Sequence, residues 1–288
     1  MTYFLLAVNA LLIVLQRIFQ QRYNAKCNGG VFFFSGMISF FAMCFFALVN
    51  RDWSFNTALI LPAIGFGLSY AAATVFAVLA IRSGSLAKTT LIISYSLLIP
   101  ALSGYVVLKE PIGAIKIVAF ALLVISLWLT NHKKSTAKTT NERVTVKWIV
   151  YVLLSFIGNG MCATVQKLTP HFVDTNLLND DLYMCLALGL STVILLTASL
   201  LTKETEVKSS LRISCPLALF CGLFNGAANY LAIYLNQFIP ASVMFPVLSA
   251  GEIVLVFIYS LLVCRERFNL KQWMGFIVGV ISIVMLNL

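Results

Sequence analysis

The chain has 288 residues, of which 60% are hydrophobic and only 10% are charged, against about a quarter charged in an ordinary soluble domain. Stretches such as 58–81 and 213–239 contain no charged residue, which excludes a soluble fold because no polar face remains for water. The formal charge is +10. The basic residues lie between the apolar stretches and form no stripe with interleaved aromatics, so nucleic acid is disfavoured as a partner.

Apolar length and turn residues predict ten helices. The alternating polarity that a membrane barrel needs is missing, so the fold class is all-α, a polytopic membrane protein with ten transmembrane helices. The first stretch lacks the basic start and cleavage site of a signal peptide and is expected to be retained. In chain order the predicted helices cover residues 2–20, 31–49, 58–81, 86–108, 112–131, 147–168, 181–201, 213–235, 239–263 and 270–288.

A polar stretch at residues 132–146 divides the chain near its middle. It starts with His132 and is rich in Lys and Thr, a polar composition typical of a flexible linker. The sequence therefore predicts two five-helix domains, 1–131 and 147–288, joined by this linker.

The two halves carry a weak internal repeat. Its register drifts slowly in one direction, as expected for a diverged duplication. Because each half holds an odd number of helices, the second half enters the membrane in the opposite orientation, and such inverted repeats are typical of secondary transporters. The matches are Gln16-Arg17 with Gln166-Lys167, displaced by 150 residues, Gly67-Leu68 with Gly222-Leu223, displaced by 155, and Val107-Leu108-Lys109-Glu110 with Val263-Cys264-Arg265-Glu266, displaced by 156.

Two segments also carry a family resemblance. Residues 108–112 (LKEPI), with their partner 264–268 (CRERF) and the Gly-rich stretch 272–279 that follows, are similar to the EamA-type repeat of the drug/metabolite transporter superfamily. The resemblance covers nearly the whole chain through its five-plus-five layout. It implies a secondary transporter, an exporter in the cell membrane, for small organic metabolites such as amino acids. Two departures are a first helix without the small-residue Trp-Gly pattern of relatives, and Lys109 where a glycine often precedes the glutamate.

The orientation of the chain rests on its basic residues. Most of the 20 Lys and Arg residues lie in the joints after the odd-numbered predicted helices. Since basic loops stay in the cytoplasm, this distribution places both termini outside. The family resemblance instead favours both termini inside, so the orientation stays open at this point.

Glu252 is the only acidic residue deep inside a predicted helix, and Ser249 lies one turn before it. Polar groups inside a membrane are costly and usually face the bundle interior or a wet cavity. Glu252 is therefore a candidate to bind a cation or to take up a proton, which makes protons a candidate coupling partner. The alternative is structural, with Glu252 pairing to a buried base such as Arg17 or Lys167.

Arg17 and Lys167 occupy equivalent places in the two halves, each preceded by a glutamine. Long basic side chains near a helix end can reach the membrane interface, which is one interpretation. The other is that Gln16 with Arg17, and Gln166 with Lys167, line opposite mouths of a central cavity. There they would recognise the carboxylate or another polar head of a substrate.

Two further polar stripes occupy equivalent helices of the two halves. Asn225, Asn229 and Tyr230 lie in 213–235, and Tyr70 and Thr74 lie in 58–81. Such residues can simply hold helices together in lipid, but two related stripes favour a shared cavity. The residues expected to complete it are Asn159 and Tyr95, with Ser94, Ser96, Ser242 and Pro246 as further candidates.

No pattern in the sequence indicates a cofactor or a metal site. The seven cysteines are isolated, and no HExxH, nucleophile elbow or phosphate-binding Gly loop occurs. The predicted function is solute transport by alternating access, with a small-molecule substrate and the lipid bilayer as partners, in a monomer or homodimer that is not an enzyme. The alternatives are an uncoupled facilitator, an integral membrane enzyme acting on lipids, and a non-transporting scaffold or receptor.

Overall fold

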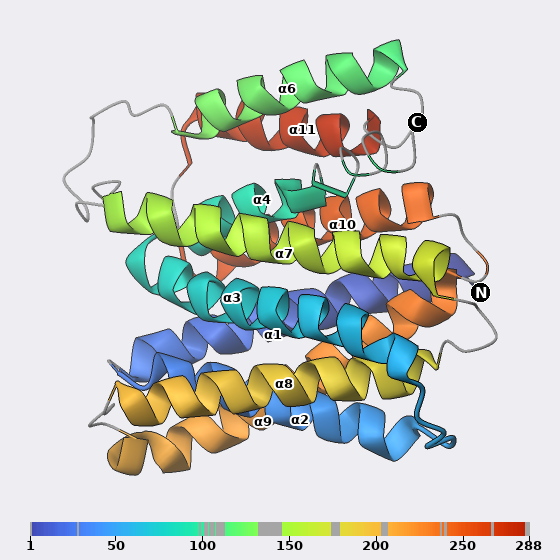
Figure 1. Cartoon of the computed structure of the whole chain (residues 1–288). Coiled ribbons are helices and arrows are strands. Elements are labelled where there is room, and N and C mark those ends of the chain that lie inside the picture. Colours follow the sequence, from blue (N-terminus) through green and yellow to red (C-terminus); the bar gives the residue numbers. More distant parts are fainter. Residues whose placement is uncertain are drawn as a thin grey trace.

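The regular structure of the described residues is entirely helical (Figure 1). The computed structural model describes residues 2–27, 29–97, 99–100, 103, 107, 113–131, 146–173, 179–202, 207–236, 238, 241–265 and 268–285. The α-helices are α1 (Thr2–Lys26), α2 (Val31–Val49), α3 (Ile60–Ser83), α4 (Leu86–Ser94), α6 (Ala114–Asn131), α7 (Val146–Phe172), α8 (Asp180–Leu201), α9 (Val207–Asn236), α10 (Ala241–Leu262) and α11 (Leu270–Met285), with short 3-10 turns η1 (Thr57–Leu59) and η2 (Tyr95–Leu97). The predicted all-α class is confirmed.

Six stretches of the described residues are long and apolar enough to cross a membrane. About 30 Å of hydrocarbon requires some 20 apolar residues in a helix, and two shorter apolar helices, Leu248–Leu262 and Leu270–Met285, fall below that length. The chain is therefore a multi-pass membrane protein. The six stretches are Phe4–Lys26, Val31–Val49, Thr57–Ser83, Val146–Thr169, Asp180–Leu201 and Ile213–Leu235.

The first helix is longer than its apolar stretch predicts. It continues from residue 20 to Lys26, because Tyr23 stacks on Phe34 with ring centroids 3.7 Å apart and Asn24 bonds to α3. Hydropathy cannot mark this boundary, since the added turn is polar yet packed. As a result Arg17 lies in the interior of α1 and not near its end. The predicted linker 132–146 lies outside the described residues, apart from Val146.

The directions of the helices follow from contacts between α1, α3 and α7. Asn24 of α1 donates to the carbonyl of Val78 on α3 at 2.9 Å. Farther along both helices, Arg82 donates to the carbonyl of Cys27 at 3.1 Å. Residue numbers rise together along this contact, so α1 and α3 run parallel.

Helix α7 runs the other way. Ser155 donates to the carbonyl of Ala73 at 3.0 Å, whereas Val165 lies beside Gly65, so numbers rise along α7 as they fall along α3. Since α1 is parallel to α3, the first helices of the two halves run in opposite directions. The repeats are therefore inverted, as predicted.

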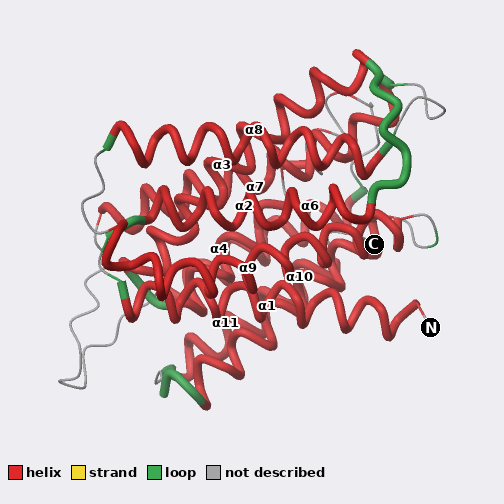
Figure 2. The backbone as a smooth tube through the Cα atoms, turned by 90° about the horizontal axis from the view of Figure 1, so that it is seen from below, coloured by secondary structure: helices red, strands yellow, loops and turns green. Residues whose placement is uncertain are grey.

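The helix contacts also repeat when the two halves are exchanged. The counterparts are α1 and α7, α2 and α8, and α3 and α9. Replacing each helix by its counterpart turns the α1–α9 contact into α7–α3 and the α2–α9 contact into α8–α3, and all four contacts are extensive. The contacts α2–α8 and α6–α11 map onto themselves. In Figure 1, α6 and α11 lie together at one side of the bundle, and α2, α8 and α9 lie at the other. The tube in Figure 2 shows the start of α1 and the end of α11 at the same end.

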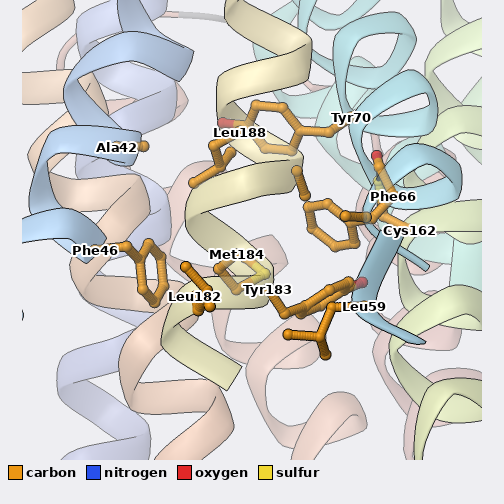
Figure 3. Close-up of a cluster of buried hydrophobic side chains, with 12 residues drawn as sticks. Ala42, Phe46, Leu59, Phe66, Tyr70, Cys162, Leu182, Tyr183, Met184 and Leu188 are labelled. Atoms are coloured by element: carbon orange, nitrogen blue, oxygen red, sulfur yellow. Dashed lines mark hydrogen bonds between the residues drawn. The ribbon is translucent and has the colours of Figure 1, made fainter. Parts of the chain in front are cut away.

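A cluster of buried aromatic and aliphatic side chains joins α2, α3, α7 and α8, and we call it the aromatic cluster (Figure 3). Phe66 and Tyr183 meet edge to face, with centroids 5.9 Å apart. The cluster lies toward the end of the bundle where α8 begins. Its members are Ala42, Phe46, Leu59, Ala63, Phe66, Tyr70, Cys162, Leu182, Tyr183, Met184, Ala187 and Leu188.

Charged side chains divide between the two ends of the bundle. The end where α1 finishes and α4, α7 and α11 start carries basic residues, and the opposite end carries the described aspartates. The basic set is Arg22, Lys26, Arg82, Lys88, Lys147, Arg265 and Lys271, and the opposite set is Arg51, Asp52, Lys167, Asp180 and Asp181.

Candidate functional site

A polar cavity of about 190 Å³ lies between the two halves. It is lined from α1, α3, α4, η2, α7, α9 and α10. A water molecule occupies about 30 Å³ of liquid, so the cavity has the volume of about six waters. It is large enough for one small metabolite. The polar side chains of its wall are Asn9, Gln16, Arg17, Gln20, Tyr70, Thr74, Ser94, Ser96, Ser155, Asn159, Gln166, Asn225, Asn229, Ser249 and Glu252.

One face of α1 supplies the densest part of this wall. Asn9, Gln16, Arg17 and Gln20 line the cavity, and their spacing of seven, one and three residues keeps them on one side of the helix. Asn9 and Gln20 have no exposed surface. These four polar residues face the cavity because the other faces of α1 pack against α9, α10 and α3.

Arg17 and Glu252 form an ion pair in the cavity wall. Arg17 Nε donates to Glu252 Oε1 at 3.0 Å, with 13% and 10% of the two side chains exposed. The other carboxylate oxygen accepts from the Ser94 hydroxyl at 3.5 Å. Glu252 therefore pairs with Arg17, as the structural alternative expects, while its role in binding a cation or a proton stays a prediction. Arg17 lies in the cavity wall and not at the membrane interface.

Asn225 is the centre of a second network. Tyr70 donates to Asn225 Oδ1 at 2.8 Å, and Asn225 donates to Gln16 Oε1 at 3.2 Å. Asn229, one turn later on α9, donates to the same Oδ1 at 3.2 Å and to the Asn225 carbonyl at 2.9 Å. The network connects α1, α3 and α9 across the middle of the bundle.

The described wall on the α7 side is polar but carries no charged member. Asn159 donates to the Ser96 hydroxyl at 2.7 Å. Gln166 lies 4.0 Å from the Met184 sulfur, beside the aromatic cluster. This side therefore offers neutral hydrogen-bonding groups only.

The cavity residues are related by the inverted repeat. Asn225 is the counterpart of Tyr70, so the 2.8 Å bond joins two equivalent positions and lies at the pseudo-symmetry axis. At the 156-residue displacement of the last matched segments, Ser96 takes the position equivalent to Glu252. The equivalent pairs in the wall are Asn9 with Asn159, Gln16 with Gln166, Tyr70 with Asn225, Thr74 with Asn229, and Ser96 with Glu252.

Ten of the thirteen residues predicted for the site line the cavity, and three do not. Tyr95 points between α6 and α11, where its hydroxyl bonds to Ser126. Tyr230 packs edge to face against Phe45 with centroids 6.2 Å apart. Lys167 is half-buried outside the wall. The side chains of Ser242 and Pro246 lie outside the described residues.

Asn9, Gln20 and Ser155 line the cavity and were missed by sequence reasoning. Asn9 is displaced by 150 residues from Asn159, which was predicted, so the repeat itself held the signal. Gln20 lies one turn beyond Gln16 on the same face. It fell at the expected end of the first helix, where side chains usually meet water. Ser155 gives no distinguishing signal in a helix of mixed small residues.

A second, wider pocket of about 880 Å³ opens at the aspartate-bearing end. Asn179 holds its rim together by donating to the carbonyl of Asp52 at 2.8 Å. The pKa of the exposed Asp52 carboxyl is lowered, because it accepts hydrogen bonds from the backbone N–H and the hydroxyl of Ser54. The aromatic cluster lies between this pocket and the polar cavity, since Phe66 and Tyr70 belong to both the cluster and the cavity wall.

The described residues contain no group of three or more His, Cys, Asp or Glu side chains able to hold a metal ion. The cavity has one carboxylate among amides and hydroxyls. This donor set suits hydrogen bonding to a polar organic solute.

Comparisons with known proteins add a family and a fold. Residues 146–288 match the family model described as the EamA-like transporter family. No curated protein matches the chain. A solved structure described only as "Crystal structure of protein" is similar over 98% of this chain and 98% of its own, with a TM-score of 0.62 and 9% sequence identity. At that identity the likeness concerns the fold alone.

Proposed function

The second half of the chain, residues 146–288, belongs to the EamA-like transporter family, and from this premise we propose that the whole chain is a secondary transporter. It exports small organic metabolites, such as amino acids, across the cell membrane. Its two inverted halves alternate access to the polar cavity between them. The proposal extends the transporter-type assignment of the second half to the first through the shared repeat.

One observation carries the proposal. A small cavity rich in amides and hydroxyls lies on the pseudo-symmetry axis, and both halves contribute equivalent residues to its wall. In alternating access the site stays near the membrane middle while the halves rock around it. A cavity built symmetrically by both halves is the arrangement that such a motion requires, and a lipid-modifying enzyme would have no need of it.

The aromatic cluster supports the same motion. It adjoins both the polar cavity and the wide pocket at the aspartate-bearing end, which is where an alternating-access carrier needs a gate. Opening would need Phe66 and Tyr183 to move apart while the packing at the other end tightens. The concentration of basic residues at the opposite end favours a cytoplasmic location for it, with both termini outside.

The test is solute counterflow in proteoliposomes. Detergent-purified full chain is first screened by thermal shift against amino acids, sugars, nucleosides and cationic drugs. Vesicles preloaded with each stabilising solute are then diluted into its radiolabelled form. We expect transient accumulation of label in vesicles that contain the protein. Asn225→Leu, which removes the centre of the network, should abolish it, whereas Thr202→Ala at the exposed end of α8 should not.

Three outcomes would contradict the proposal. Absence of counterflow with every solute class argues against transport. Equal counterflow by Asn225→Leu and wild type argues against this cavity. Altered lipids in the vesicles, detected by mass spectrometry, would favour the membrane-enzyme alternative. Accumulation that does not change with any imposed ion gradient would still show transport, but by a facilitator that uses no coupling ion.

A further inference from the structure

Arg17 has binding capacity that its partner does not use. A guanidinium carries five N–H donors arranged to hold a carboxylate through two parallel bonds. Among the described residues, Arg17 makes a single hydrogen bond, from Nε to one oxygen of Glu252. The pair is thus joined at one point only. Donors of Arg17 remain for a second acceptor in the cavity.

Two amide side chains of α1 have buried atoms without a hydrogen-bond partner among the described residues. Gln20, three residues beyond Arg17, has no exposed surface, and neither its amide nitrogen nor its carbonyl oxygen has a hydrogen-bond partner among the described residues. Asn9 bonds the carbonyl of Ala228 at 3.1 Å through its nitrogen, but its oxygen has no partner. Buried polar atoms left unpaired are costly and call for an explanation. Both residues line the cavity, so a bound solute with donors and acceptors would supply the missing partners.

Charge balance restricts which solute can bind there. Arg17 and Glu252 are the only charged side chains among the described residues of the wall, and together they are neutral. A carboxylate entering beside them would add an uncompensated negative charge in a poorly solvated site, which is strongly unfavourable. Protonation of Glu252 removes that charge and releases Arg17 at the same time.

The described side chains of the helices packed against α10 bring no competing charge to Glu252. They are α1, α4, α9 and α11. α1 presents Arg17 and α4 presents the Ser94 hydroxyl, while the other basic side chains of these elements lie at the basic end. The remaining described ionisable side chains of these five helices are Tyr23, Arg22 and Lys26 on α1, Lys88 on α4, Cys215, Cys221, Tyr230 and Tyr234 on α9, Tyr259 on α10 and Lys271 on α11.

We propose that Glu252 is a resident carboxylate on Arg17 that the carboxylate of the transported solute replaces, with Glu252 taking up one proton from water as it is released. The substrate class is therefore small organic monocarboxylates, which enter the cavity together with a proton. Gln20 and Asn9 bind the rest of the solute through their unpaired atoms. No bond other than the O–H bond of Glu252 forms, and the total charge of the site is unchanged for a simple acid. The inference rests on the proposed transport function and names its substrate class.

The binding test uses matched carboxylates and amides with the detergent-purified full chain. Isocaproate, isovalerate and butyrate are each compared with the corresponding amide by thermal shift at several pH values. We expect the acids to stabilise the protein and the amides not to do so. For a singly charged acid, uptake of one linked proton makes apparent affinity rise about tenfold for each pH unit lowered while Glu252 is ionised.

Proton uptake on wild-type protein provides a readout that needs no variant. Adding isocaproate in weak buffer with a pH indicator should take up one proton per bound carboxylate. Glu252→Gln, which imitates the protonated residue, should bind isocaproate without pH dependence and without proton uptake. Arg17→Gln should lose acid binding, and Thr202→Ala, at the exposed end of α8 and outside the cavity, should keep both acid binding and proton uptake.

Different failures lead to different conclusions. Equal stabilisation by acids and amides, or acid binding without proton uptake by wild type, overturns the exchange at Arg17. No acid binding by a protein that shows counterflow of another solute overturns the carboxylate class and leaves transport standing. No counterflow of any solute overturns the proposed function itself.

Discussion

The two sides of the cavity are equivalent by the repeat and differ in chemistry. On the α1 side, Arg17 and Glu252 face each other as ions. On the α7 side the counterpart of Glu252 is Ser96, which accepts from Asn159, and the counterpart of Arg17 is Lys167, which lies outside the wall. Duplication supplied two similar scaffolds, and charge was concentrated on one of them. The arrangement of the helices follows the symmetry of the repeat. The proposed recognition of the solute and its coupling to a proton depend instead on the charged pair, which only one side carries.

The largest expected effect comes from breaking the charged side. Removing one member of a buried ion pair leaves the other unpaired and costs on the order of 3 kcal/mol. We therefore expect Arg17→Gln and Glu252→Gln each to lower the unfolding temperature clearly at neutral pH. The double variant should recover most of the loss, because no isolated charge remains. Thermal unfolding of the four proteins in detergent gives the coupling energy, and purely additive effects would show that the two ions do not interact.

The next effect tests the symmetric part of the comparison. Gly67 and Gly222 are counterparts, and a Cβ at either would lie 2.6 Å or 2.7 Å from a backbone oxygen, of Ala187 on α8 or of Ile38 on α2. Gly67→Ala and Gly222→Ala should each destabilise the protein by about 1 to 3 kcal/mol through overpacking. Gly113→Ala, which meets nothing within 4 Å, is the control. A large difference between the two core variants would argue that the halves do not pack equivalently.

The neutral side should respond more weakly than the charged side. Asn159→Ala and Ser96→Ala each remove one hydrogen bond of 2.7 Å, which is worth about 1 kcal/mol. Since both variants lose the same bond, the double variant should be little worse than either single one. A loss as large as that of Arg17→Gln would remove the contrast between the two sides.

The smallest effect is expected at the axis itself. Tyr70→Phe removes one donor to Asn225 Oδ1 but leaves the donation from Asn229, so the acceptor stays partly satisfied. We expect a loss of about 0.5 kcal/mol in stability. Asn225→Ala, which removes the acceptor and its bond to Gln16, should cost more under the same conditions. Equal losses of stability in Tyr70→Phe and Asn225→Ala would show that Asn225 is not the centre of the network.

The sequence was sufficient for the fold because lipid leaves the backbone few choices. Uncharged stretches mark helices directly, and the odd number of helices in each half predicts the inversion that α1, α3 and α7 display. Helix ends were predicted less well. Polar turns such as the one around Tyr23 continue a helix through packing that hydropathy does not record.

The candidate site was only partly predictable for a similar reason. Residue type places Glu252, Asn225 and Asn159 inside the membrane, but it does not say which helix face meets the cavity. Tyr95 and Tyr230 are polar as well, yet Tyr95 packs between α6 and α11, and Tyr230 packs against Phe45 and lines the wide pocket at the aspartate-bearing end. Conversely, Gln20 stood where a helix was expected to end. Only the packing of α1 against α3, α9 and α10 assigns it to the cavity.

The ion pair also determines how the empty protein responds to voltage. A membrane potential does about 2.3 kcal/mol of work on each elementary charge per 100 mV crossed. Arg17 and Glu252 carry opposite charges whose bonded atoms are 3.0 Å apart, so a motion that carries them together displaces no net charge. Return of the empty protein is then electrically silent, and any current recorded during turnover belongs to the transported solute and its coupling ion.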